Sequence, residues 1–239
     1  MADTTCLPFI LGVEMLAITN HTFPKDAEET LERFGHRTLR LVPHPDMLLF
    51  FAPDTIFCTK SYYEIATREL DEISSVYGAP IRFIKKEYES EYPKDVLLNA
   101  LPFGKYLFCN SKTIAKELLL LEFLHCHVNQ GYTKCSSLPL ENQALITADA
   151  SIAKCAKEHG IDVLQIQKGH ISLPGYDYGF IGGCASFAPR GGMNTVFFCG
   201  NLSGHPDAHR IESFCDLHNF SVVNLSQDRL CDTGTIFMI

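Results

Sequence analysis

The chemically richest stretch of the chain, residues 168–184, carries an imidazole, a carboxylate and a thiol on a glycine-rich frame. His170, Asp177 and Cys184 are side-chain types that proton transfer and nucleophilic attack use. Five glycines in the same seventeen residues permit positive φ angles and close backbone approach. The stretch is therefore compatible with a functional site and equally with a turn that leads into a tightly packed strand. The pattern of the surrounding sequence is needed to distinguish the two.

The composition is that of an ordinary globular protein of 239 residues, with 46% hydrophobic and 20% charged side chains. A formal net charge of −8 argues against a nucleic-acid partner, because phosphate binding needs a basic surface, and it suits a cationic small molecule. The apolar runs 7–18 and 97–108 are interrupted by Glu14 and Lys105 and are too short to span a membrane. We therefore expect a small-molecule ligand, with neither a nucleic acid nor a membrane as partner.

Ten cysteines are spread along the chain without a Cys-x-x-Cys pair, which favours reduced thiols in a cytoplasmic protein over a disulfide framework. His125 and His127 share one face of an expected strand, and His205 and His209 lie four apart on an expected helix. Neither pair has a third ligand at an obvious spacing. The sequence also lacks a Walker motif, a Gly-x-Ser-x-Gly elbow and a Gly-x-Gly-x-x-Gly turn. We therefore expect no metal and no cofactor.

An acidic or amide residue followed by a short apolar run recurs at intervals of 49, 47, 35 and 55 residues. The five positions are Asp46, Asp95, Asn142, Asp177 and Asp232. A strand–helix–strand pattern separates successive positions, with helices expected at 24–33, 61–76, 111–121, 149–159 and 205–218. Repeats of this kind bury their apolar faces against one another.

From this repeat we predict an α/β fold in which residues 1–239 form a single domain of five strand–helix–strand units around a shared centre. Strands are expected at 7–18, 38–42, 47–51, 55–58, 80–84, 96–98, 105–109, 123–128, 144–147, 161–166, 178–183, 195–199, 220–225 and 233–239. The last strand should pair with the first unit and close the ring. The five acidic or amide residues would then converge, and carboxylates that converge must pair with cations, be hydrated or shift their pKa.

Three phrases of the sequence resemble the pentein, or guanidine-modifying enzyme, superfamily: 129–136 (Asn-Gln-Gly-Tyr-Thr-Lys-Cys-Ser), 169–184, and 204–207 (Gly-His-Pro-Asp). The superfamily includes dimethylarginine dimethylaminohydrolase, arginine deiminase, agmatine deiminase and amidinotransferases. The chain looks most similar to an uncharacterised branch, a domain of unknown function. The resemblance covers most of the chain and implies a β/α propeller of five pseudo-repeats around a central channel.

Catalytic members of that superfamily use an acid, a histidine and a cysteine. The stretch 94–97 (Lys-Asp-Val-Leu) resembles their acid motif with lysine in place of glycine, and 169–170 (Gly-His) resembles their histidine motif displaced by one position. The resemblance implies that Asp95 binds a guanidinium and that His170 is a general acid–base. Their nucleophilic cysteine lies in the last strand, where this chain has apolar residues after Asp232, so a nucleophile would have to be Cys184 or Cys231.

Two functions are compatible with these residues. One is a binding protein that holds a small guanidino or amine cation in the central channel, contacted by Asp46, Asn142, Asp177 and Asp232, without the usual cysteine-dependent hydrolase chemistry. The other is an active guanidino-group hydrolase or deiminase that uses Asp95, His170 and a relocated cysteine. The same side chains also have structural interpretations, in which the acids accept backbone hydrogen bonds at turns and the cysteines pack in the core.

Overall fold

Five three-stranded sheets of one design are formed by the residues that the computed structural model describes, 15–41, 44–188 and 194–239. In each sheet the middle strand pairs antiparallel with one neighbour and parallel with the other. Written from the antiparallel edge to the parallel edge, the sheets are β15 (Phe237–Met238), β1 (Met15–Asn20) and β2 (His36–Leu41); β3 (Phe50–Ala52), β4 (Thr55–Cys58) and β5 (Ile81–Phe83); β6 (Leu101–Phe103), β7 (Tyr106–Cys109) and β8 (Leu124–His127); β9 (Ser137–Leu140), β10 (Ala144–Thr147) and β11 (Asp162–Gln165); β12 (Ala185–Ala188), β13 (Asn194–Phe198) and β14 (Phe220–Asn224).

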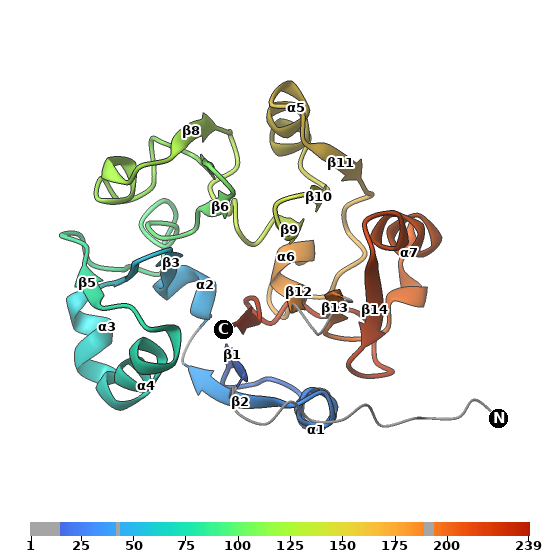
Figure 1. The fold of residues 1–239 in the computed structure, drawn as a ribbon, viewed down its shortest axis with the longest axis horizontal. Coiled ribbons are helices and arrows are strands. Elements are labelled where there is room, and N and C mark those ends of the chain that lie inside the picture. The colour runs from blue at the N-terminus through green and yellow to red at the C-terminus, as the bar shows by residue number, and fades with distance from the viewer. Residues whose placement is uncertain (1–14, 42–43, 189–193) are drawn as a thin grey trace.

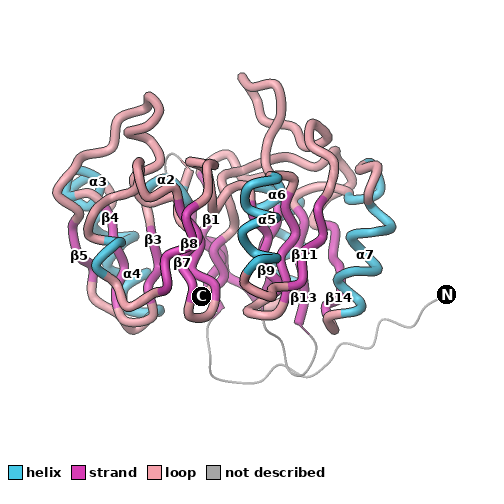
Figure 2. The backbone as a smooth tube through the Cα atoms, turned by 90° about the horizontal axis from the view of Figure 1, so that it is seen from above, coloured by secondary structure: helices cyan, strands magenta, loops and turns pink. Residues whose placement is uncertain are grey.

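Helical segments connect the two parallel strands of every sheet, because parallel neighbours cannot be joined by a tight turn. These connections hold α1 (Lys25–Arg33), α3 (Lys60–Ile65) with α4 (Thr67–Tyr77), the 3₁₀ turn η1 (Leu118–Leu120), α5 (Ala150–Glu158), and the 3₁₀ turn η2 (Leu202–Gly204) with α7 (Ala208–Leu217). Two single-turn helices, α2 (Pro45–Leu48) and α6 (Ile181–Cys184), lie outside these connections. Figure 1 shows the five sheets following one another around the middle of the molecule, and Figure 2 shows their strands running roughly along one direction.

The C-terminal strand completes the first sheet, as the sequence predicted. β15 pairs antiparallel with β1 through Ala17↔Met238 and Ile18↔Phe237, and the two ends of the described chain therefore lie in one sheet. Figure 1 places the C-terminus next to β1 in the middle of the molecule. The predicted first strand begins earlier than β1, and its residues 7–14 lie outside the described residues.

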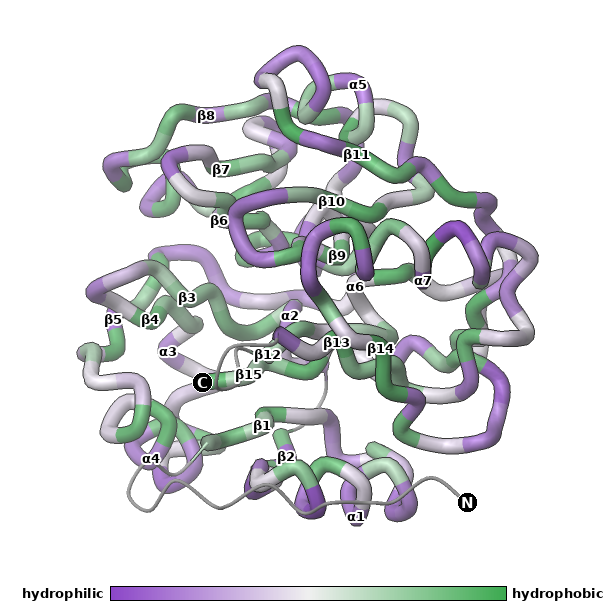
Figure 3. The backbone as a smooth tube through the Cα atoms, turned by 45° about the vertical axis from the view of Figure 1, so that its right-hand side comes forward, coloured by the Kyte–Doolittle hydropathy of each residue, from purple (hydrophilic) through white to green (hydrophobic). Residues whose placement is uncertain are grey.

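Local sequence accounts for most of the helices. α4 ends at Gly78, whose φ of 76° is open to glycine without cost, and Asp149 caps α5 by accepting from the backbone N–H of Ser151 (2.8 Å) and Ile152 (2.9 Å). Each helix turns an apolar face toward its sheet, and Figure 3 shows the strands mainly in the apolar colour. No helix within the described ranges combines the length and apolar character that a membrane crossing requires.

The predicted helix at 111–121 is wrong except for the short 3₁₀ turn η1. The amide of Ala115 donates to the carbonyl of Leu97 at 2.8 Å, and Asn110 accepts from the amide of Lys112 at 3.2 Å through its side chain. These bonds take two amides out of helical register, so tertiary contacts override the local helix propensity.

The predicted positions of four innermost strands are shifted along the chain. Residues 47–48 belong to the one-turn helix α2 and residues 97–98 form a turn, and the strands begin at Phe50 and Leu101. Residues 144–147 form the middle strand of their sheet, and the innermost one is β9, whose Pro139 is tolerated because an edge strand pairs on one side only. Residues 181–184 form α6, in which Gly182 and Gly183 pack so closely on residues 134, 137 and 232 that a Cβ atom has no room at either position.

Candidate functional site

A cavity of about 420 Å³ is lined by the antiparallel-edge strand of every sheet. We call β3, β6, β9, β12 and β15 the inner strands and this space the inner-strand cavity. Its walls are mainly apolar and include Phe51, Leu101, Phe187 and Phe237. The side chain of Lys134 also lines it, and the Lys134 ammonium lies 5.5 Å from the centre of the Phe237 ring, within cation–π range.

Two carboxylates meet a lysine and a threonine in the turns that precede the inner strands. Asp46 and Asp232 are both buried, with Asp46 at the start of α2 and Asp232 at the turn before β15. The hydroxyl oxygen of Thr235 lies 3.0 Å from Asp46 Oδ2 and accepts from Lys134 Nζ at 3.2 Å, and it also contacts the carbonyl of Gly182 at 2.5 Å. The hydroxyl group of Thr235 thus links the amine of Lys134 to the carboxylate of Asp46.

Asp232 holds together the backbone around it. Its Oδ2 accepts from the amide of Phe180 at 2.8 Å and its Oδ1 from the amide of Gly234 at 2.9 Å. A Cβ atom at Gly183 would overlap this carboxylate, and one at Gly182 would overlap the carbonyls of residues 134 and 137. Burial, together with the nearby Asp46 charge, raises the pKa of Asp232 to about 6. The glycine pair is therefore needed for packing around this acid.

Cys135 is a thiol enclosed by polar groups, and the sequence analysis did not select it. Its Sγ donates to Asp46 Oδ2 at 2.8 Å and accepts from Asn99 Nδ2 at 2.9 Å. Asn99 in turn accepts from the amide of Lys134 at 2.8 Å. Burial and the Asp46 charge raise the pKa of Cys135 well above the ordinary thiol value, so it is a neutral hydrogen-bond donor. Its place in the 129–136 phrase was the only sequence feature that pointed to it.

Asp95 lies in a different setting, among aromatic rings. The hydroxyl of Tyr132 donates to Asp95 Oδ2 at 2.5 Å, and the Tyr132 ring stacks on Phe180 with centroids 5.9 Å apart. The ring centroids of Tyr92 and Tyr132 are 6.0 Å apart. Burial is the largest cause of a raised pKa at Tyr132, and the hydrogen bond to Asp95 raises it further. Burial raises the pKa of Tyr88 as well, and the charges of Asp95, Tyr176 and Asp46 add to that rise.

Asp46 and Asp95 each have one oxygen without a hydrogen-bond partner among the described residues. Asp46 is 1% exposed and Asp95 is 5% exposed, yet neither Oδ1 atom meets a donor among the residues that the structure describes. Buried carboxylate oxygens are nearly always hydrogen-bonded in proteins, and an unmatched one calls for a specific explanation. The two acids are therefore the members of the predicted set with unused binding capacity.

The remaining predicted residues do not join Asp46 and Asp232. Asn142 lies exposed in the β9–β10 turn, where its Oδ1 accepts from the amide of Gly104 at 2.7 Å, and Asp177 is exposed in its loop. The expected convergence of all five acidic or amide residues is therefore wrong for these two. The misplacement of β9 explains Asn142, because the turn that holds it follows the inner strand instead of preceding it.

His170 and the two selected cysteines also lie apart from an acid–histidine–thiol arrangement. His170 is exposed, and its ring meets the edge of His205 at 5.4 Å. Cys184 is fully buried and donates to the carbonyl of Ile181 at 3.4 Å, in keeping with the structural interpretation in which it packs in the core. Cys231 is partly buried. Its pKa is raised mainly by this burial and further by the charge of Asp232.

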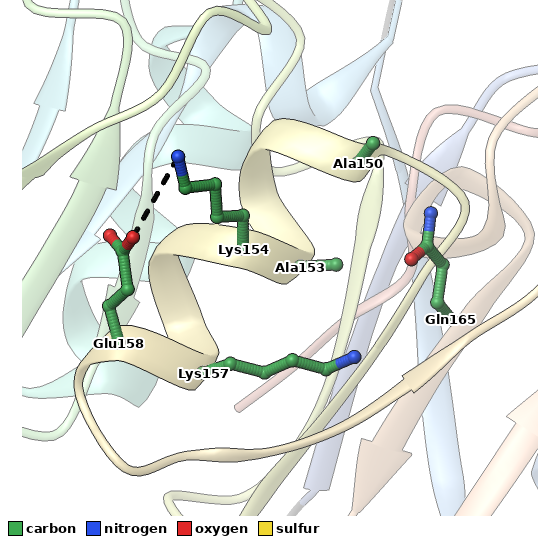
Figure 4. Close-up of a pocket in the computed structure, with 6 residues that line it drawn as sticks. All are labelled: Ala150, Ala153, Lys154, Lys157, Glu158 and Gln165. Carbon is green, nitrogen blue, oxygen red and sulfur yellow. Dashed lines mark ion pairs between the residues drawn. The ribbon is translucent and has the colours of Figure 1, made fainter.

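Two further hollows offer less chemistry. One of about 480 Å³ is lined by Gln130, Asp149, Tyr178 and Phe180, but Asp149 already caps α5 through Oδ1 and accepts from Gln130 through Oδ2 at 3.4 Å. The other lies over α5, where Figure 4 shows long lysine and glutamate side chains directed away from one another or paired along the helix surface. Neither is lined by a buried carboxylate oxygen that lacks a partner among the described residues.

The fold is shared with solved structures of guanidine-modifying enzymes. Agmatine deiminase from C. jejuni superposes with a TM-score of 0.53 at 8% identity, over 95% of this chain and 92% of its own. An amidinotransferase of the saxitoxin pathway from Microseira wollei gives a TM-score of 0.48 at 12% identity, over 90% of this chain and 89% of its own. Identities this low establish a common fold and no more. The predicted likeness in fold to a guanidine-modifying enzyme is confirmed.

Sequence comparison gives the narrower assignment. No curated protein matches the chain significantly. A family model described as "Family of unknown function (DUF6873)" matches residues 30–237, a span that holds four of the five sheets whole and the buried acids Asp46, Asp95 and Asp232. The chain is therefore a member of the DUF6873 family.

Proposed function

We propose that this pentein-like protein binds a small molecule with a guanidino or amine cation, held by Asp95 and Asp46. The observation that carries the proposal is the pair of buried Oδ1 atoms without a donor among the described residues. A guanidinium group presents five N–H donors in a plane, and an ammonium presents three, so either has more than the two donors that these oxygens require. Charge-assisted bonds of this kind are roughly twice as strong as neutral ones.

The aromatic groups around Asp95 suit the same ligand. Tyr132 and Phe180 stack on each other, and Tyr92 lies against Tyr132. The face of an aromatic ring attracts a cation, and the attraction grows where water is excluded. A methylated guanidino or amine group, which has fewer N–H donors, would gain most from these rings. The net charge of −8 favours the approach of such a cation.

We propose further that the five units form a single β/α propeller around a central channel, with the ligand site at the end where the turns precede the inner strands. The inner-strand cavity and the pairing of β15 with β1 support this arrangement. In it, Lys134 separates the acids from the apolar cavity, because its side chain lines the cavity while its ammonium reaches Thr235. Asp232, with both oxygens engaged by backbone amides, shapes the site without contacting the ligand.

The proposal is for binding without the cysteine-dependent chemistry of catalytic penteins. Residues 233–239 contain no cysteine, and Cys135 is a neutral thiol with a strongly raised pKa. A thiolate is the species that attacks a guanidinium carbon. One observation favours hydrolysis as a second candidate: Cys135 Sγ lies 2.8 Å from Asp46 Oδ2, which is a possible acceptor for the thiol proton.

Titration calorimetry with agmatine, arginine, asymmetric dimethylarginine and putrescine tests the proposal, with citrulline as the uncharged control. We expect at least one cation to bind, citrulline not to bind, and Asp95→Asn to weaken the binding by about tenfold or more through the lost charge-assisted bond. Asp177→Asn is the matched control, since it makes the same substitution at an exposed carboxylate. Absence of binding by every cation, or equal binding by Asp95→Asn, would contradict the proposal.

The same ligands separate binding from hydrolysis. Release of ammonia, urea or citrulline from a bound cation, abolished by Cys135→Ser, would replace the binding proposal with the hydrolase. Cys184→Ser and Cys231→Ser extend the test to the two thiols selected from the sequence. We expect no release from any of the four proteins.

A further inference from the structure

A second group of chemically active side chains lies away from the acids, between β8 and α5. Cys126 is buried on β8, Cys155 is partly buried on α5, and His159 follows the last residue of α5. One ligand atom from each of these three residues lies within 4.8 Å of the other two. It is the one such group of His, Cys, Asp and Glu side chains among the described residues.

The imidazole of His159 is oriented for coordination. Its Nδ1 lies 2.8 Å from the carbonyl of Cys155, and a carbonyl can only accept, so Nδ1 carries the proton. The other nitrogen, Nε2, is then left with a free lone pair and lies 3.6 Å from Cys126 Sγ. A backbone carbonyl that fixes the tautomer in this way is the usual support of a metal-binding histidine. The rings of Tyr106 and Phe108 hold the imidazole at 5.0 and 6.4 Å.

The placement of the two helical ligands follows from their spacing. Residues four apart lie on one face of a helix, so Cys155 and the adjoining His159 both reach toward β8. The neighbouring positions Lys154 and Glu158 pair with each other at 3.9 Å on the solvent side, as Figure 4 shows. One face of α5 is thus an ordinary solvated surface. Another face carries Cys155, with His159 just beyond the end of the helix, and both lie close to Cys126 on β8.

We propose that Cys126, Cys155 and His159 form a zinc site. Two sulfurs and one imidazole nitrogen make a ligand set that zinc accepts in tetrahedral geometry, with water as the fourth ligand. Both thiols lose their protons to solvent as zinc–sulfur bonds form, so no oxidant or further reactant is needed. The ion would join the sheet β6–β7–β8 to the helix of the next sheet, and its binding would stabilise the folded protein.

Helix α7 supplies a natural control for this site. It carries the buried Cys215, and His218 follows its last residue, as His159 follows α5. His218 Nε2, however, lies 3.0 Å from the carboxylate of Asp162. Cys215→Ser therefore removes a buried helical cysteine of similar setting without touching the proposed ligands.

Cobalt titration of the reduced, chelator-treated full-length protein tests the site. We expect one Co²⁺ per chain, a thiolate-to-cobalt charge-transfer band with the visible bands of tetrahedral cobalt, loss of both on adding Zn²⁺, and a higher melting temperature with Zn²⁺. His159→Asn should weaken cobalt binding by roughly tenfold or more, and Cys126→Ser and Cys155→Ser should remove the charge-transfer band, while Cys215→Ser keeps it. His159 is exposed, so its replacement does not threaten folding.

Two results would overturn the zinc site. One is a reduced wild-type protein that takes up no cobalt with tetrahedral thiolate character. The other is a cobalt spectrum and affinity that His159→Asn leaves unchanged, since that would place the ion on other ligands. A Cys126–Cys155 disulfide in freshly isolated protein, followed by failure to bind cobalt after reduction, would assign the pair to redox chemistry instead.

Discussion

Asp232 and Asp95 occupy comparable places before an inner strand and are both 5% exposed, yet their surroundings differ completely. Asp232 accepts a backbone N–H on each oxygen and packs against a glycine backbone. Asp95 accepts a phenol on one oxygen, and its other oxygen has no donor among the described residues. Burial and position in a repeat therefore do not distinguish an acid that maintains the fold from one with capacity for a ligand. Hydrogen-bond satisfaction does.

The side chains around each acid explain this difference. Around Asp232 the chain has Gly179, Gly183 and Gly234, which let backbone amides approach the carboxylate. Beside Asp95 it has Tyr132, whose phenol donates to one oxygen and whose ring lies against that of Tyr92. The acid among glycines is thus bonded to backbone amides, and the acid among aromatic rings is bonded to a phenol and retains an oxygen without a donor among the described residues.

The largest expected effect comes from closing the space beside Asp232. Gly183→Ala places a Cβ on the carboxylate, and the carbonyl of Gly183 is fixed by the amides of Thr233 and Thr235, each at 3.0 Å. We expect a loss of about 3 kcal/mol or more in unfolding free energy, since overpacking that needs backbone movement costs that much. Gly78→Ala is the control: its φ of 76° is strained for alanine but its surroundings are open, so about 1 kcal/mol is expected. Urea unfolding measures both, and equal losses would show that Gly183 is not tightly packed.

The raised pKa of Asp232 predicts a pH dependence of definite sign. The folded protein holds a proton on Asp232 up to about pH 6, whereas the unfolded chain releases it near the ordinary value of 3.8. Between these values the native state binds more protons, so the contribution of Asp232 to stability falls as pH rises, by at most about 3 kcal/mol, and is constant above.

Asp232→Asn isolates that contribution, because it removes the titration while other acids remain. The difference in unfolding free energy between wild type and Asp232→Asn, measured in urea at intervals from pH 3.5 to 7, should decrease through this window. A difference that is flat, or that increases with pH, would mean that the carboxylate is stabilised in its charged form by the two amides and not destabilised by burial and Asp46.

The fold was largely predictable from the sequence, because each unit combines a buried middle strand with an amphipathic helix. The runs that became β4, β10 and β13 are continuous and apolar, and four helices end at a glycine or asparagine with positive φ. The inner strands were harder to predict because they are only two to four residues long and pair on one side. Their starts depend on turns that tertiary contacts determine, as at Gly182 and Gly183.

The site was predictable in part. Asp46, Asp95 and Asp232 were selected by their places in the repeat, and all three are buried beside the inner strands. Tyr132, Lys134, Cys135 and Asn99 were not selected, because their roles arise from contacts between residues 35 to 101 positions apart. No periodicity or spacing reports such pairings. The aromatic setting of Asp95 likewise depends on Phe180, from a different unit of the chain.

A smaller effect is expected at the bond between Tyr132 and Asp95. Tyr132→Phe removes the only donor described for the Asp95 carboxylate and should cost about 2 kcal/mol, the range for a hydrogen bond to a charged group. Tyr92→Phe is the control, because that ring is exposed and its hydroxyl is not bonded to Asp95. A double-mutant cycle with Asp95→Asn, followed by thermal or urea unfolding, measures the coupling directly. Additive losses would show that the two groups are not coupled and would remove the aromatic contribution from the comparison.

The smallest effects are expected in the stretch that the sequence made most prominent. His170 and Asp177 are exposed, so His170→Gln and Asp177→Asn should each change the unfolding free energy by less than about 0.5 kcal/mol. If the ligand is held at Asp95 and Asp46, both variants should also bind a cationic ligand nearly as the wild type does, while Asp95→Asn does not. A drop of about tenfold in affinity for His170→Gln, with stability unchanged, would instead mean that the loop moves onto the acids when ligand binds. That result would return His170 to the site. Replacing an exposed side chain lowers ligand affinity without lowering the free energy of unfolding only if that side chain touches the ligand or orders a loop that touches it.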